Sequence, residues 1–476
     1  MYRFLLDNDG SNFFCHTMGD SVEASIAEAV ADCPPEVSTY LLCATGAGKF
    51  YYPTQVGEVV AEDYAKVGRE GRLLELHARG QDPFGLFLQA LRRAGKETFI
   101  TYRMNDVHHA DQPDHPAIPA FRKAHPELIV DQPAVLAGKA DWMCYCMDYT
   151  HTAVREYILA TLEELIGRYE MDGLQLDWLR FPRHLSGTPE EVWEKRHLLT
   201  EFTAQVRALI KRSGKDMLLG ARVPTSPEGC QRVGLDIAAW TARGLVDFLV
   251  ATPFLTTDFS MPIRQLRAAL GLHPVPLYAD LEFGHSNQVH CPESLRAAAL
   301  GLWSSGADGI YLFNFPCWTE YLGSRPYHWI ADLTEEQHAA QKPLLFSVPH
   351  RLWRLPLIDL PAQLPAPLPS GGALSLSLSL PPAALPARRA LVLVHGGGDL
   401  CCSLNGQSLT ELSHLRRSEL FVEYRDEALK AHWPAAADCR LFQADPALLR
   451  PGENHLLLDH RTGGDLEIRR VNLGLW

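Results

Sequence analysis

The sequence predicts a (β/α)8 TIM-type barrel followed by a small all-β sandwich of the jelly-roll type, on three observations. Apolar strand-like segments alternate with helix-like patterns through residues 1–335. A doubly wound nucleotide-binding sheet would carry a glycine-rich dinucleotide loop or a GxxxxGK[ST] phosphate loop, and the sequence contains neither. After about Leu333 the sequence becomes proline-rich and then alternates apolar and polar residues. We therefore assign 1–335 to the catalytic barrel and 336–476 to a proline-rich connection and a C-terminal β-sandwich domain.

Eight apolar segments predict the eight barrel strands. In order they are YRFLL, STYLLCATG, ETFITYRMND, DGLQLDW, MLLGARVP, VDFLVATPF, PVPLYADLEF and DGIYLFNFP. They are too continuously apolar to face water on one side, as expected of parallel strands buried on both faces. Between them, REYILATLEELIGRY carries one apolar stripe, and TPEE from Thr188 has the capping hydroxyl, proline and early acids of a helix start.

The C-terminal part contains shorter strand signals. ALSLSLSL, from Ala373 to Leu380, alternates strictly, and RRALVLVHGGG, LFVEYRD and LLRPGENHLLLDH follow it. We expect such a domain to pack against the barrel or a second subunit, and the alternative is that it binds carbohydrate.

Composition excludes several classes of protein. The 476 residues are 46% hydrophobic and 21% charged, and the net charge of −13 argues against binding a nucleic-acid backbone. No apolar run is long enough to cross a bilayer. The N-terminus, MYRFLLDNDG, has no signal-peptide features, so we expect a cytoplasmic protein unless a leader was removed. The eleven cysteines are scattered and lack zinc-site spacing, so we expect reduced, mostly buried thiols.

Polar side chains cluster where the predicted strands end, which is where (β/α)8 barrels carry their chemistry. They are Asp7, Asp9, Arg103, Asn105, Asp106, His108, His109, Asp177, Trp178, Arg180, Arg183, Arg222, Thr252, Asp280, Glu282, Asn314 and Trp318. Carboxylates, an amide and aromatic rings suit a sugar, and converging arginines suit a carboxylate on that sugar. We therefore expect Arg103 and Arg180 to hold an acid group of the ligand.

Other arrangements of these residues stay open. Many retaining barrel glycosidases end strand four with Asn-Glu and strand seven with Glu. Glu282 fits the glutamate of strand seven, but strand four of this chain ends in DWLR, which lacks the expected acid. Asp177 could still act with Asp9 or Glu282, or it could form an ion pair with Arg180. NDVHHADQPDHP is rich in histidine and aspartate, but LLDNDG lacks the His-x-His that metal-dependent barrel hydrolases usually carry. We expect no metal and no other cofactor.

Four motifs resemble an inverting sialidase family, glycoside hydrolase family 156. They are DNDG after strand one, YRMNDVHH after strand three, DWLRFP after strand four and FNFP after strand eight. The resemblance implies a (β/α)8 barrel with a β-rich C-terminal domain. It also implies an aspartate general base, a histidine general acid, and arginines that hold the carboxylate of sialic acid.

The resemblance also assigns roles to individual residues of this chain. It places the base on Asp9 with Asp7 as rival, the acid on His108 with His109 less favoured, the carboxylate clamp on Arg103 and Arg180, and sugar contacts on Asn314, with Asp7 and Asp177 nearby. Asp106 would help to keep the acid charged. The implied function is release of terminal α-linked sialic acid from sialylated glycans with inversion, by a homodimer that binds neither nucleic acid nor membrane. The alternatives are a glycosidase or lyase for uronic-acid glycans, in which Asp177 and Glu282 act, and a non-catalytic carbohydrate-binding protein.

Overall fold

A computed structural model describes most of the chain. The described residues are 3–61, 71–112, 114–282, 291–318, 327–334, 336–350, 355, 357–358, 360–385, 387–412 and 439–476. The predicted segment LFVEYRD and the side chain of Trp318 lie outside this description.

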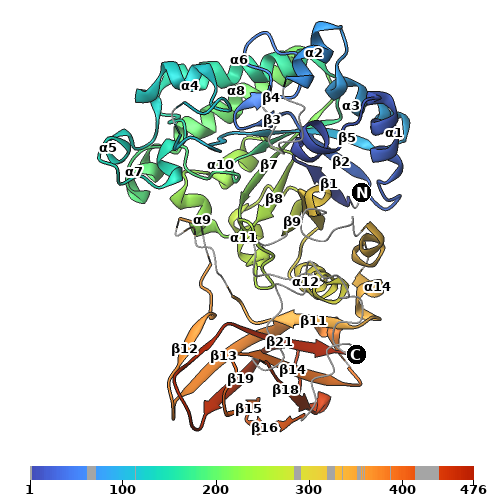
Figure 1. Ribbon diagram of the computed structural model, residues 1–476, viewed down its shortest axis with the longest axis vertical. Coiled ribbons are helices and arrows are strands. Elements are labelled where there is room, and N and C mark those ends of the chain that lie inside the picture. The colour runs from blue at the N-terminus through green and yellow to red at the C-terminus, as the bar shows by residue number, and fades with distance from the viewer. Residues whose placement is uncertain are drawn as a thin grey trace. The chain divides into compact units, whose positions relative to one another are not determined.

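The predicted barrel is confirmed by strand order. Eight described strands close in the order β1-β10-β9-β8-β7-β6-β5-β2, and the paired neighbours run parallel (Figure 1). The strands are β1 Leu5–Asn8, β2 Thr39–Cys43, β5 Glu97–Arg103, β6 Gly173–Asp177, β7 Leu218–Pro224, β8 Phe248–Thr252, β9 Leu277–Glu282 and β10 Gly309–Phe313. A short hairpin, β3 Thr45–Gly46 and β4 Lys49–Phe50, follows β2.

Large apolar side chains fill the barrel interior. The buried cluster consists of Leu5, Leu41, Phe99, Phe248, Val250, Tyr278, Tyr311 and Phe313. Phe99 and Phe248 lie with ring centroids 5.6 Å apart. A Cβ on Gly220 would fall 2.0 Å from the Phe248 ring, so β7 needs glycine opposite this bulky residue. Close packing of this kind keeps the strand ends, and therefore the polar side chains that follow them, in fixed positions.

Helices alternate with the strands as predicted. The α-helices are α1 Val22–Ala31, α2 Arg72–Ala78, α3 Pro83–Arg93, α4 Ala120–Ala124, α5 Gln132–Leu136, α6 Thr152–Arg168, α7 Pro189–Glu194, α8 His197–Ser213, α9 Pro227–Arg232, α10 Ile237–Ala242, α11 Ile263–Ala269, α12 Pro292–Ser304 and α14 Glu336–Ala340. The apolar stripe predicted on α6 is buried at Ile158, Leu162 and Leu165. Thr188 forms the predicted capping box at the start of α7. Within the described residues, each helix is too short or too polar to cross a membrane.

The C-terminal part is built from antiparallel sheets, as predicted. Its strands are β11 Leu344–Ser347, β12 Ala366–Leu368, β13 Ala373–Leu380, β14 Ala390–His395, β15 Leu400–Leu404, β16 Gln407–Ser408, β17 Thr410–Glu411, β18 Cys439–Ala444, β19 Gly452–His460, β20 Leu466–Ile468 and β21 Arg470–Leu475. One sheet has the order β11-β21-β14-β18-β17, a second β13-β19-β15-β16, and β12 pairs with β20 (Figure 1). In β13 the leucines at 376, 378 and 380 are buried, which explains the alternating sequence.

Contacts divide the chain into two compact units. The first comprises Met1–Phe254, Gln265–Asp280 and Tyr311–Cys317, and the second comprises Leu255–Arg264, Leu281–Ile310 and Trp318–Trp476. The boundary predicted at 335/336 therefore stays a prediction. With the exception of Glu282 and Trp318, the candidate residues lie in the first unit.

Candidate active site

Asp9 lies just beyond the end of β1, in a turn that fixes its carboxylate. Ser11 donates to Asp9 Oδ1 through both its backbone N (3.0 Å) and its hydroxyl (2.7 Å). Asn314, which follows β10, donates through Nδ2 to Asp9 Oδ2 at 3.0 Å, and Cys317 Sγ lies 3.4 Å from Oδ1. The first and last barrel strands are neighbours, so these contacts tie both ends of the barrel sequence to one carboxylate.

The charge state of Asp9 follows from its surroundings. Arg103, the last residue of β5, donates through Nη2 to Asp9 Oδ2 at 3.2 Å. Burial alone would raise the pKa of the Asp9 carboxyl, but Arg103 and the hydrogen bond from Ser11 outweigh burial and lower that pKa below its ordinary value. Asp9 is therefore ionised at neutral pH and able to accept a proton.

Asp106 connects Arg103 to His108. Arg103 Nη1 donates to Asp106 Oδ2 at 3.0 Å, and the backbone N of Ala47, in the turn between β3 and β4, donates to the same oxygen at 2.9 Å. His108 Nδ1 lies 2.5 Å from Asp106 Oδ1. Burial opposes the charge on Asp106, but His108 and Arg103 hold its pKa far below its usual value. Asp106 is therefore an ionised carboxylate that fixes the His108 ring.

His108 also contacts Arg180, which completes a continuous chain of polar contacts. His108 Nε2 lies 3.0 Å from Arg180 Nη2, and the His108 side chain is 37% exposed. The order of contacts is Asn314, Asp9, Arg103, Asp106, His108 and Arg180. We call this set the polar relay. It brings together Asn314, Asp9, Arg103, His108 and Arg180, which the resemblance assigned to catalysis and substrate binding, with Asp106, which it expected to support the acid.

Aromatic rings surround the Arg180 end of the polar relay. The Arg180 guanidinium lies 5.1 Å from the Phe181 ring centre and 5.9 Å from that of Phe254. The Phe181 and His108 rings are perpendicular, with centres 5.1 Å apart, and the half-buried Trp142 contacts both phenylalanine rings. This is the kind of polar group beside an apolar wall that suits a sugar ring and its substituents.

A second, deeper cluster surrounds Arg222. Its guanidinium donates to Asp177 Oδ2 at 2.9 Å and to Asp280 Oδ2 at 3.3 Å. Asp7, on β1, is fully buried beside them. Burial raises the pKa of Asp7 to about 7, Asp177 adds to that effect, and Arg222 opposes it. Burial raises the pKa of Asp280 to about 7 as well, and Arg222 opposes it there too. Asp7 and Asp280 are therefore both uncharged or half-charged members of a group of carboxyls that share one arginine.

Replacing Asp7 by asparagine is expected to change how stability depends on pH. Because the folded pKa is raised, the native state binds the proton more tightly than the unfolded chain, so stability from this group is lost as pH rises from about 4 to 7. When the pH rises from about 5 to 8, the free energy of unfolding of Asp7→Asn should increase relative to that of wild type by on the order of 1–3 kcal/mol. Urea unfolding at both pH values measures this gain, with exposed Asp20→Asn as the control. An equal difference at both pH values would contradict it.

Gly10 holds the Asp9 turn in a conformation that a side chain would disturb. Its φ is +80°, and a Cβ would fall 2.6 Å from the Tyr51 ring. Gly10→Ala is expected to displace Asp9 and to lower kcat about 10- to 100-fold. Gly80 also has positive φ (+76°), but a Cβ there meets nothing within 4 Å, so Gly80→Ala is the matched control. Equal activity of the two variants would show that the turn does not position Asp9.

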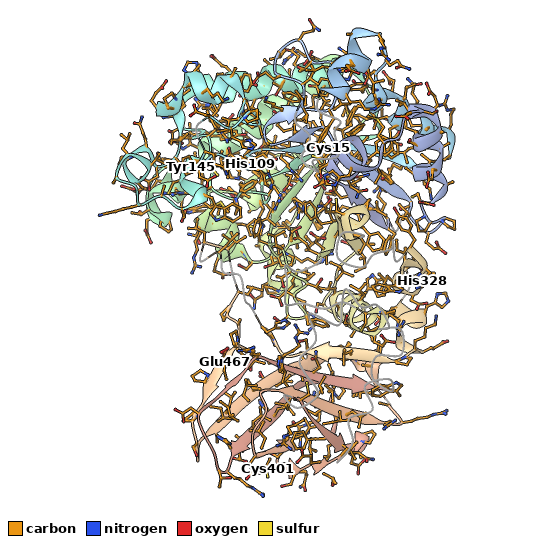
Figure 2. All side chains as sticks on the ribbon, in the orientation of Figure 1. Cys15, His109, Tyr145, His328, Cys401 and Glu467 are labelled. Carbon is orange, nitrogen blue, oxygen red and sulfur yellow. The ribbon has the colours of Figure 1, made fainter. Side chains whose placement is uncertain are left out.

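Several predicted site residues lie apart from the polar relay. Asp177 is buried against Arg222, and it accepts hydrogen bonds from the backbone N atoms of Leu179 (2.9 Å) and Arg180 (3.1 Å). Its ion pair is therefore with Arg222, and not with the Arg180 side chain that the sequence left open as an alternative. His109 stacks on His115 with ring centres 4.0 Å apart, and His109 is labelled in Figure 2. Arg183 pairs with Asp131 at 3.3 Å.

Two further candidates, one aromatic and one acidic, are buried away from the polar relay. Trp178 is fully buried and packs against Tyr149, His184, Phe202 and Trp240, so it belongs to the core. Glu282 is buried and belongs to the second unit, where its backbone bonds to Thr257. No group of three or more His, Cys, Asp or Glu within the described ranges is arranged to hold a metal ion.

Sequence reasoning missed the residues that support the polar relay from outside the strand ends. They are Ser11, the Ala47 backbone, Trp142, Phe254 and Cys317. Of these, Ser11 carries a sequence signal, because a serine two residues after an aspartate often bonds back to it in a turn.

Comparisons with known proteins add no family assignment. No family model matches the chain, and no curated protein matches it. Similar solved structures include α-L-fucosidase isoenzyme 2 from Paenibacillus thiaminolyticus (TM-score 0.46, 13% identity) and the PgaB (BpsB) glycoside hydrolase domain from Bordetella bronchiseptica (0.47, 13%). A third is the Group IV chitinase from Ostrinia furnacalis (0.40, 10%). The similarity covers 73%, 70% and 70% of this chain, and 51%, 99% and 99% of theirs. The chain thus spans about half the length of the fucosidase. The resemblance to family 156 stays a prediction, and the functional argument rests on the side chains.

Proposed function

We propose that this protein is a glycoside hydrolase that acts on a sugar bearing a carboxylate, and specifically that it releases terminal sialic acid from glycans with inversion. One observation carries the proposal. The polar relay joins an ionised carboxylate, two arginines and a partly exposed histidine at the carboxyl ends of the barrel strands. These groups can supply a base, an acid and a carboxylate anchor for hydrolysis of an acidic glycoside.

Asp9 is the proposed general base. It is ionised, and Ser11, Arg103 and Asn314 fix both of its oxygens. Water activated by Asp9 would attack the anomeric carbon on the face opposite the leaving group, and the water's proton would pass to the carboxylate. Two groups, Arg103 and Asp106, lie between Asp9 and His108 in the relay. Asp9 and His108 therefore do not act on each other directly, and inversion needs room for a water and the sugar ring between base and acid.

His108 is the proposed general acid. Its Nδ1 is held by Asp106, so Nε2 is the atom from which a proton can reach the departing oxygen. Its side chain is 37% exposed, whereas that of Asp106 is 1% exposed. Asp106 therefore orients and supports the imidazole from behind, while the imidazole faces the ligand.

Arg180 is the proposed principal anchor for the ligand carboxylate, with Arg103 deeper in the site. Arg103 already binds Asp9 and Asp106 and is 4% exposed, whereas Arg180 is half-buried. A planar guanidinium binds a carboxylate through two parallel hydrogen bonds. Trp142 would offer an apolar surface to substituents of the same sugar.

The alternative mechanism on uronic-acid glycans receives no support from the deeper cluster. Its proposed acid or base, Asp177, has a side chain that is 0% exposed and is engaged by Arg222. Its proposed partner, Glu282, is buried in the second unit.

The test is proton NMR of the purified protein acting on a simple α-sialoside, followed from the first seconds. Appearance of β-configured free sialic acid first supports the inverting sialidase. If the α anomer appears first, the enzyme is retaining and the pairing of Asp9 with His108 is wrong. If no sugar is released, the sialidase proposal falls. Uronic-acid glycans are then the next substrates, and binding without turnover on them would indicate a carbohydrate-binding protein.

A further inference from the structure

The contact between Arg180 and His108 has a chemical consequence for the proposed acid. A guanidinium has only donors, so the His108 Nε2 that lies 3.0 Å from Arg180 Nη2 must accept through its lone pair. The proton of the neutral ring then lies on Nδ1 and is donated to Asp106 Oδ1. In this arrangement His108 is neutral, and the nitrogen that should protonate the leaving group has no proton to give.

We propose that a ligand carboxylate draws Arg180 away from His108, and that the imidazole then takes up a proton from solvent at Nε2. The acid group of the substrate thereby creates the general acid that cleaves it. This inference rests on the proposed function, because it assigns the same two residues to the same site.

The charges that surround His108 favour this coupling. Asp106 and Arg180 contact the ring directly, and Arg103 and Asp9 follow along the polar relay. Two carboxylates and two guanidinium groups cancel, so a neutral His108 leaves the relay without net charge. A bound ligand carboxylate adds one negative charge, and a proton on His108 restores the balance.

The remaining groups near the ring do not alter this balance. The His109 ring centre lies 6.5 Å from that of His108, and His109 stacks on His115 and feels the charge of Asp111. Burial and these neighbouring histidines lower the pKa of His109, so His109 is neutral at pH 7. Phe181 is uncharged and contributes only an apolar ring contact.

The two partners of His108 differ in how firmly they are held. Asp106 is 1% exposed and is fixed by Arg103 and the Ala47 backbone, so the imidazole keeps its support when Arg180 leaves. Arg180 is half-buried against the rings of Phe181 and Phe254. These ring contacts are made by the guanidinium itself, and they constrain its direction less than the hydrogen bonds that fix Asp106, so the guanidinium can turn toward a ligand.

The coupling would give the enzyme two levels of selectivity. A neutral sugar would lose the ion pair with Arg180, and it would also meet a histidine that carries no transferable proton. Discrimination would then appear in kcat as well as in KM, since the carboxylate acts on the chemical step.

The test measures the proton on His108 directly. Nitrogen NMR of the full chain with ring-labelled histidine, assigned by comparison with His108→Gln, reports protonation of Nε2 at about pH 7.5. We expect an unprotonated Nε2 in the free protein and a protonated one with saturating N-acetylneuraminic acid or concentrated acetate. The methyl ester of N-acetylneuraminic acid, and chloride at equal ionic strength, should have no effect. Calorimetry in two buffers of different ionisation enthalpy should show uptake of roughly one proton per bound carboxylate.

Two variants assign the effect to Arg180. In Arg180→Met acetate should cause no proton uptake, whereas Arg183→Met, which removes an arginine paired with Asp131, should behave like the wild type. A protonated Nε2 in the free protein overturns the inference. So does an Nε2 that stays unprotonated with both carboxylates, or uptake that persists in Arg180→Met. If acetate protonates Nε2 but no α-sialoside is cleaved, the coupling stands and the proposed function falls. If α-sialosides are cleaved with inversion but Nε2 stays unprotonated with both carboxylates, the proposed function stands and the coupling falls.

Discussion

His108→Gln is expected to lower kcat on an α-sialoside with a poor leaving group about 10²- to 10⁴-fold. Glutamine keeps a polar side chain beside Asp106 but cannot deliver a proton to the departing oxygen. The loss should be much smaller on an aryl sialoside such as the 4-nitrophenyl glycoside, because a stable phenolate leaves without full protonation. The measurement is kcat on both substrates for both proteins.

The matched control is His109→Gln. His109 is the neighbouring residue, but its ring stacks on His115 rather than contacting Asp106. We expect its kcat to stay within about threefold of wild type, since surface substitutions rarely disturb more than their own contacts. If His109→Gln shows the leaving-group-dependent loss and His108→Gln does not, the acid is His109.

Asp9→Asn is expected to lower kcat about 10³-fold or more on both leaving groups, because the attacking water loses its base whatever departs. The change is isosteric, so Ser11 can still donate to the remaining oxygen. Arg103 keeps its second partner, Asp106, which limits the loss of folding stability to about 1–3 kcal/mol. Thermal unfolding of the variant checks that the fold is retained.

The comparison with Asp7→Asn decides between the two aspartates of DNDG. Asp7 is fully buried among charged side chains, and Asp9 is a member of the polar relay. A loss of turnover in Asp7→Asn with activity retained in Asp9→Asn would assign the base to Asp7. An equal and large loss in both would show that the deeper cluster also supports the chemistry.

Much of the site followed from the sequence because parallel strands of a barrel end at one face. Asp9, Arg103, His108, Arg180 and Asn314 come from four different strands, yet each follows an apolar run closely enough to be placed at that face. Asp7 and Asp9 are two residues apart, so the two-residue side-chain period of a strand does not distinguish them and does not say how deep each carboxyl lies.

The pairings within the site could not be predicted from the sequence. Whether Asp177 takes Arg180 or Arg222 depends on side-chain packing between β6 and β7, where register sets Asp177 beside Arg222. The same is true of Trp178, whose position after a strand suggested a sugar platform but whose neighbours bury it completely. The Ala47 contact comes from backbone geometry, which no side-chain pattern reports.

The bond between Asn314 and Asp9 links residues separated by 305 positions. During synthesis on the ribosome, Asp9 emerges long before its partner, by about 15–60 s at ordinary elongation rates. Over that interval the base lacks the amide that fixes it, and β1 lacks its neighbour β10. On the proposed mechanism, catalytic competence should therefore appear only after Asn314 has emerged, and chains that stop before residue 314 should be inactive however much of the barrel they contain.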